Sequence, residues 1–201
     1  MPILTFPTLS RSAPNAFEWA LLSNTQTFSS PLTGAVQTTE MPGARWRVAM
    51  AMDSLSANDS ALLRAFLAQL RGVSGRFYMP NLARPNPRGA ATGNPVVSGA
   101  GQTGNTLVTS GWSNSITGIL RAGDYFGVND ELKMMVADAN SNGSGVSTLT
   151  FEPPLRSSPL TGATITTVRP TAIFRLEDDA SRWTTTAPVL DNFSITAVES
   201  W

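Results

Sequence analysis

The sequence contains no histidine and no cysteine, and Lys133 is the only lysine among its 14 basic residues. Histidine is the usual proton shuttle near neutral pH and the commonest metal ligand, whereas cysteine supplies thiolate nucleophiles, zinc ligands and disulfides. Their absence excludes most catalytic chemistries, although paired carboxylates and oxygen-ligated metals remain. We therefore expect a structural building block and not an enzyme, with no catalytic residue, no cofactor and no metal.

Charge is also scarce, since charged residues make up 14% of the 201-residue chain, against roughly a quarter in average proteins. The formal net charge is zero, so the chain lacks the electrostatic footprint of a nucleic-acid or membrane-surface protein. No run approaches the roughly 20 apolar residues of a membrane-spanning helix, and residues 1–14 do not resemble a signal peptide. These patterns predict no nucleic-acid sequence recognition, no membrane insertion and synthesis in a cytoplasm.

Glycine, proline, serine, threonine and asparagine take the place of charge, as in proteins built from many short strands and turns. Apolar residues alternate with polar or small ones over 17–21 and 45–52, which predicts half-buried strands, and a polar strand is predicted over 25–30. One helix is predicted over 56–71, because Ser56 is a suitable N-cap, an apolar stripe follows at helical spacing and Gly72 is a stop signal. The sequence therefore predicts a mainly β fold with one α-helix.

The second half of the chain begins with a change of composition. Residues 81–104 are rich in glycine, proline, asparagine and arginine, which predicts a linker or an extended arm. Short strand candidates separated by turn signals then occupy 106–168, at the spacing of a small antiparallel barrel or sandwich. Two more strands are predicted over 172–176 and 192–198.

Carboxylates are the remaining group with catalytic or metal-binding potential. The acidic turn 177–179 and the oxygen-rich loop 138–145 could each ligate Ca²⁺, but neither has the spacing of an EF-hand, and plain turns explain both better. Glycoside hydrolysis needs a pair of carboxylates that can be remote in sequence. Candidates for such a pair, none of them in a recognisable motif, are Glu18, Glu40, Asp124, Asp130 and Glu131.

The arginines and tryptophans point to contacts between proteins. Arginine pairs with carboxylates in a bidentate way, and arginine and tryptophan dominate interface hot spots. Arginines at 71–88 beside Phe77 and Tyr78 could also form a strip for single-stranded nucleic acid, but the zero net charge favours protein contacts. The three tryptophans in polar surroundings, Trp112, Trp183 and Trp201, could instead stack on sugar rings. The predicted subunit-interface residues are Arg45, Arg47, Arg76, Arg84, Arg88, Trp112, Trp183 and Trp201.

Several segments together are similar to a known family. The segment Gln26-Thr27-Phe28-Ser29-Ser30-Pro31-Leu32, a turn into Arg45-Trp46-Arg47 and a capped helix ending in Leu70-Arg71-Gly72 resemble the ring domain of bacteriophage distal tail proteins. Residues 120–126 and 148–155 resemble a small barrel inserted in phage tail and baseplate proteins, and 172–176 and 193–199 resemble strands that return to the ring domain.

The resemblance implies an organisation and a function. A β-sandwich ring domain with one helix would comprise 1–80 and 171–201, and 81–170 would be a linker and an inserted small antiparallel barrel. The protein would be a virion component that forms a ring, usually a hexamer, and joins the tail tube protein to the hub or tip proteins of the baseplate. The alternatives are a carbohydrate-binding module that uses Trp112 or Trp183, and a glycan hydrolase.

Overall fold

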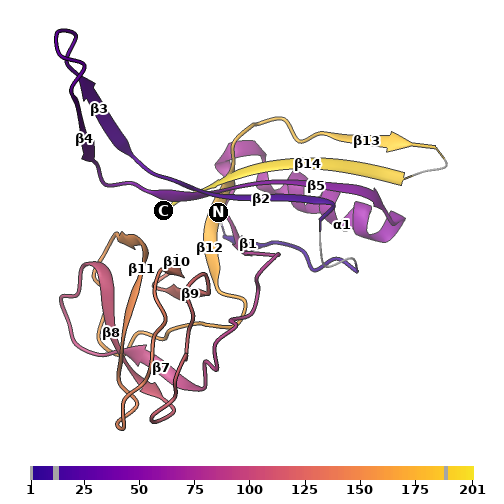
Figure 1. Ribbon diagram of the computed structural model, residues 1–201. Helices are drawn as coiled ribbons and strands as arrows, with labels where there is room; N and C mark the ends of the chain where they lie inside the picture. The colour runs from indigo at the N-terminus through magenta and orange to yellow at the C-terminus, as the bar shows by residue number, and fades with distance from the viewer. Residues whose placement is uncertain (1, 11–13, 188–189) are drawn as a thin grey trace.

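The computed structural model describes residues 2–10, 14–187 and 190–201. Residues 1, 11–13 and 188–189, which belong to the expected ring domain, lie outside the described residues. The fold is mainly β with one α-helix, which confirms the predicted fold class. Figure 1 shows two bodies and a projecting two-stranded hairpin, β3–β4. One body is built on a seven-stranded sheet and the other on a five-stranded sheet.

The seven-stranded sheet combines strands from both ends of the chain. Strands β12 and β14, which follow the second body in sequence, pair with β6 and β5, which precede it. Alternation in β5 turns Trp46, Val48, Met50 and Met52 to the buried face, as the sequence predicts. The strands are, in sheet order, β1 (Leu4–Thr5), β6 (Phe77–Pro80), β12 (Thr171–Leu176), β14 (Leu190–Glu199), β5 (Arg45–Leu55) and β2 (Ala16–Leu22), and β13 (Trp183–Thr186) pairs with β14.

The predicted helix is present as α1 (Ala57–Leu70). The Ser56 side chain accepts a hydrogen bond from the Asp59 backbone amide, and Arg71 closes the helix in the left-handed conformation before a 3-10 turn (Gly72–Ser74). The apolar stripe packs on the buried face of the sheet, where the Phe66 ring meets the Phe77 ring edge-on at 5.3 Å. Helix and sheet therefore share one core.

The second body is a small antiparallel barrel with its own core. Its edge strands β7 and β9 both bridge to the segment 164–166, through Val96–Thr164 and Gly127–Thr166, so this segment closes the gap between the two edges of the curled sheet. Phe126 and Phe151 pack edge-on at 5.3 Å in its interior. The strands are β7 (Gly93–Val97), β8 (Gly104–Trp112), β11 (Ser147–Leu155), β10 (Glu131–Met135) and β9 (Tyr125–Val128).

The expectation of a linker or extended arm over 81–104 is wrong for the part of this range from Ala90 onward, which belongs to the barrel. Strand β7 lies within this range, and the backbone amides of Ala90 and Ala91 donate to the carbonyls of Gly118 and Ile119 at 2.9 and 2.8 Å. Pro85 accepts a hydrogen bond from the Arg169 amide as well. The glycines and prolines that suggested a flexible segment instead allow the chain to follow the barrel surface closely.

The two bodies meet in a joint, by which we mean the contact of β9 and β10 with the large sheet. Tyr125 and Leu132 belong to the core of the large sheet, although they lie in barrel strands. The Trp46 indole N–H donates to the Leu132 carbonyl at 2.9 Å, and the Tyr125 ring lies 5.7 Å from the Trp46 ring. The buried face of the large sheet is thus covered partly by α1 and partly by the barrel.

Candidate functional site

A two-stranded ribbon, defined as β3 (Thr25–Ser29), β4 (Val36–Glu40) and the turn between them, projects from the large sheet (Figure 1). It continues the β2–β5 hairpin, but two residues (23–24) on one strand face four (41–44) on the other, which interrupts the pairing. Asn24 holds this break: its side chain donates to the Pro42 carbonyl and its own carbonyl accepts from the Met41 amide, both at 2.7 Å. The ribbon therefore leaves the sheet as a defined element.

The ribbon has almost no packing of its own. All ten strand residues are exposed, and so are the apolar side chains of Phe28, Leu32 and Val36. A two-stranded ribbon is marginally stable alone in water, and its outer strand edges offer unpaired backbone groups. Exposed apolar side chains on such an element are typical of a surface that contacts another chain.

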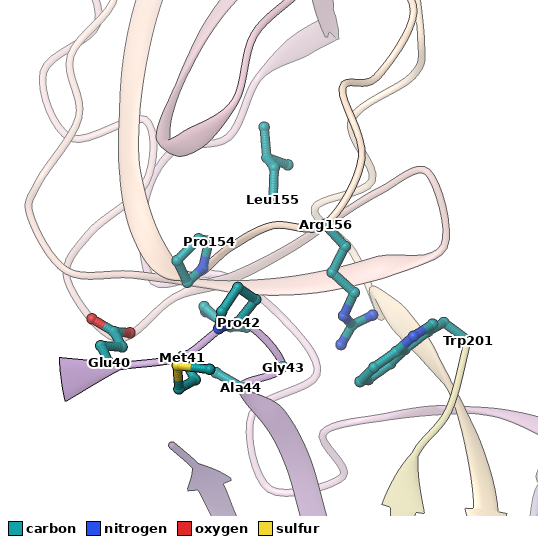
Figure 2. A pocket seen from close by; sticks show the side chains of 10 residues that line it. Glu40, Met41, Pro42, Gly43, Ala44, Pro154, Leu155, Arg156 and Trp201 are labelled. Carbon is teal, nitrogen blue, oxygen red and sulfur yellow. The ribbon is translucent and has the colours of Figure 1, made fainter. Parts of the chain in front are cut away.

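A groove of about 490 Å³ lies at the base of the ribbon, between the 40–44 segment and the end of β11. Figure 2 shows the Trp201 ring on one side of it and Pro42 and Pro154 on the other. Its lining is apolar apart from Glu40 and Arg156, and the lining residues are Glu40, Met41, Pro42, Gly43, Ala44, Pro153, Pro154, Leu155, Arg156 and Trp201.

A charged cluster lies behind the groove and ties the barrel to the large sheet. Arg156 and the buried Glu199 form an ion pair at 2.5 Å, and the Trp46 backbone amide donates to the same carboxylate at 3.0 Å. The Arg156 guanidinium is 4.2 Å from the centroid of the Trp201 ring, and the Arg45 guanidinium is 5.4 Å from it. These two cation–π contacts therefore hold Trp201 as a wall of the groove.

Lys133, the single lysine, is fully buried beside this cluster. Its ammonium lies 2.6 Å from the Glu131 carboxylate and donates to the Pro154 carbonyl at 2.8 Å. Burial lowers the pKa of Lys133, whereas the hydrogen bond and the charge of Glu131 act in the opposite direction. The Glu131 carboxylate also accepts from the amides of Arg156 and Ser157. Lys133 thus orders the strand that forms one wall of the groove.

Four of the predicted interface residues lie on the large sheet or at the groove. Arg45 and Trp201 meet at the groove, whereas Arg47 is held by the Glu177 carboxylate, with a closest contact of 2.9 Å. The Glu177 hydrogen bond and charge raise the pKa of Arg47. A fourth, Trp183, lies half-exposed on β13, with the Arg64 guanidinium 5.0 Å from its ring. The structure does not bring Trp183 to the groove.

The expectation for Trp112 is corrected by its burial. Its side chain is 3% exposed in the barrel core, and its indole N–H donates to the Thr109 hydroxyl at 2.8 Å. The ring therefore presents no surface to a neighbouring subunit or to a sugar. The prediction was wrong because Trp112 lies in a polar stretch of sequence. One of the polar residues nearby, Thr109, is itself buried in the barrel and accepts the hydrogen bond from the indole N–H.

The remaining predicted arginines are dispersed. Arg76 donates to the backbone carbonyls of residues 73–75 at 3.0–3.2 Å, and Arg88 pairs with the Asp124 carboxylate at 3.3 Å. Arg84 is exposed on the segment that leads from β6 into the barrel. Arg76 and Arg88 stabilise the chain locally, and these arginines do not form one patch.

Several of the acidic residues weighed as ligands or acids hold the local backbone through hydrogen bonds. Asp179 accepts from the Val73 amide at 3.0 Å, and Asp138 accepts from the Ala122 amide at 2.8 Å. The Asp124 carboxylate accepts from backbone amides at 2.8–3.0 Å. Across 2–10, 14–187 and 190–201, no group of three or more acidic side chains is placed to hold a metal ion.

No helix within the described part of the chain is long and apolar enough to cross a membrane. A comparison with protein-family models finds no match, and a comparison with curated proteins finds none either.

Sequence reasoning missed the residues that make the ribbon and the groove. It predicted a polar strand at 25–30 but not its partner Val36–Glu40, and it assigned no role to Arg156 or Glu199. The turn sequence Ser30-Pro31-Leu32-Thr33-Gly34 between two threonine-rich stretches is a hairpin signal that could have found the ribbon.

Proposed function

We propose that this protein is a structural, non-enzymatic subunit that assembles with copies of itself into a ring at the distal end of a phage tail. The ring, usually a hexamer in the family that the sequence resembles, would join the tail tube protein to the hub or tip proteins of the virion. The observation that carries the proposal is the ribbon, which is exposed along both strands and bears Phe28 and Val36 without an intramolecular core.

Physical reasoning supports self-association. A contact between two different surfaces of identical subunits repeats around an axis and closes into a ring when the rotation allows it. Such a ring covers the ribbon and its unpaired strand edges, which a free monomer would leave in water. The zero net charge adds no long-range repulsion between copies.

The experiment is to image the purified full chain by negative-stain electron microscopy and to measure its mass by light scattering. We expect rings from the native chain and monomers from the double variant Phe28→Ser/Val36→Ser, whose ribbon loses the exposed apolar side chains of its two strands. The double variant Val136→Ser/Val168→Ser is a matched control, because both valines are exposed on or beside the barrel. A native chain that stays monomeric at micromolar concentration, without rings, would contradict the proposal.

The two alternatives have weaker support. A carbohydrate-binding barrel would need an exposed aromatic ring, but Trp112 is in the barrel core and Trp183 lies on the large sheet. A hydrolase would need a pair of accessible carboxylates, and two of its candidates, Asp124 and Glu131, are buried and hydrogen-bonded to backbone amides.

A further inference from the structure

The tip of the ribbon carries the most exposed large apolar side chain of the described residues. Leu32 is 94% exposed at the centre of the turn between β3 and β4. The turn is nevertheless ordered by its own hydrogen bonds, since the Ser30 amide donates to the Ala35 carbonyl and the Gly34 amide to the Ser30 carbonyl, both at 2.9 Å. A preformed knob of this kind loses little conformational entropy when it enters a pocket.

The groove at the base of the ribbon is suited to receive such a knob. Its volume of about 490 Å³ is within the roughly 300–1,000 Å³ typical of pockets that bury a ligand of several side chains. Pro42, Pro154 and Leu155 supply apolar walls, and Trp201 is held in place by Arg45 and Arg156. The prolines restrict the backbone of two walls, and the two cation–π contacts favour one orientation of the indole, so the groove is present before a ligand enters.

We propose that the Leu32 tip of one copy docks into the groove of a second copy of this chain. The ribbon cannot fill its own groove, because the groove lies at its base and the tip lies at its far end (Figure 1). The tip and both flanks, Ser29 to Thr39, contain no charged residue, so docking buries no charge from the tip. Each copy then gives a tip to one neighbour and a groove to the other, which is the arrangement that closes rings.

This inference rests on the proposed self-assembly and adds the two surfaces that meet. The absence of native cysteine allows a direct test by site-specific cross-linking. One preparation carries Leu32→Cys and a second carries Ala44→Cys; they are mixed and treated with a short bis-maleimide. We expect a cross-linked dimer from the mixture far above the level from either preparation alone. A mixture of Leu160→Cys with Ala44→Cys is the control, because Leu160 is also strongly exposed but lies after β11.

Electron micrographs of the same samples separate the two levels of the proposal. Rings without cross-linking above the Leu160→Cys control would overturn the tip-to-groove contact and leave the ring function standing. Absence of both rings and cross-links would overturn the contact together with the ring function.

A second test uses charge. We expect Leu32→Asp to weaken self-association by at least about tenfold, as loss of an anchoring side chain does, and Leu160→Asp to leave it unchanged. Native-like association of Leu32→Asp would overturn the inference.

Discussion

Arg156 and Glu199 join the two bodies of the molecule through an ion pair at 2.5 Å. Arg156 follows the last strand of the barrel sheet, and Glu199 ends the long strand β14 of the large sheet. The Glu199 side chain is 1% exposed and the Arg156 side chain 18%. Because both groups are largely removed from water, each depends on the other for its solvation. The pair therefore fixes the barrel, and with it one wall of the groove, relative to the sheet that carries the ribbon.

Replacing Arg156 should be strongly destabilising. Arg156→Ala leaves the Glu199 carboxylate buried, with the Trp46 amide still donating to it but without its cation. An uncompensated buried charge costs about 3–5 kcal/mol in the free energy of unfolding. Urea denaturation followed by tryptophan fluorescence measures this change.

The matched control is Arg182→Ala. Arg182 and Asp178 are 3.9 Å apart with side chains 81% and 64% exposed, and exposed pairs contribute about 0–1 kcal/mol. Equal losses for Arg156→Ala and Arg182→Ala would show that the joint does not depend on the Arg156–Glu199 pair.

The buried pair of Lys133 and Glu131 gives a second prediction. Lys133→Met alone should destabilise the fold by about 3 kcal/mol, because the Glu131 carboxylate loses its cation. The double variant Lys133→Met/Glu131→Gln should recover part of this loss, since it leaves no unpaired buried charge and its single amide oxygen can still accept from one of the Arg156 and Ser157 amides. Thermal unfolding of the three proteins measures both changes. A double variant as unstable as Lys133→Met would mean that the contact of Lys133 with Pro154 matters more than the charge pair.

The N-cap of α1 gives a smaller effect. Ser56→Ala removes the acceptor of the Asp59 amide and should lower the free energy of unfolding by about 1 kcal/mol, whereas Ser56→Asp should retain the cap. Urea denaturation distinguishes the two. An equal loss in both variants would place the role of Ser56 outside the cap.

Local patterns in the sequence were sufficient for the elements whose partners are close in sequence. The helix was predictable because its cap, apolar stripe and stop signal lie between Ser56 and Gly72. The buried face of β5 was predictable because strand alternation depends only on neighbouring residues.

Features built from remote segments were not predictable in this way. The groove combines 40–44, 153–156 and Trp201, which no sequence spacing relates. The closure of the barrel depends on bridges from β7 and β9 to 164–166. Because these bridges join remote segments, the local composition of 81–104 did not indicate that β7 belongs to the barrel. The burial of Trp112 depends on the same closure, since the barrel core around its ring is built from side chains of several strands.

Asp124 gives a prediction with a defined pH dependence. Burial alone would raise the pKa of Asp124, but hydrogen bonds from the backbone amides of Arg88, Arg121 and Gly89 and from the Arg88 side chain outweigh burial, and the pKa lies below its usual value of 3.8. A carboxyl with a lowered pKa in the folded state stabilises the fold fully above its unfolded pKa, and this contribution is lost as the pH falls through the folded pKa.

The variant Asp124→Asn should be less stable than the native chain by about 2 kcal/mol at pH 7, because the amide has one acceptor oxygen for the backbone donors that two oxygens satisfy. The difference between the two proteins should stay constant down to about pH 5 and shrink below about pH 4, as the native carboxylate becomes protonated. Urea denaturation at pH 7, 5 and 3 measures this difference in the free energy of unfolding.

The control is Glu18→Gln, which removes a carboxylate whose side chain is 67% exposed and should change stability by less than about 0.5 kcal/mol at pH 7. If the native chain and Asp124→Asn differed in stability by the same amount at pH 3 and pH 7, the ionised carboxylate would not have this role, because an uncharged acceptor would then do as well.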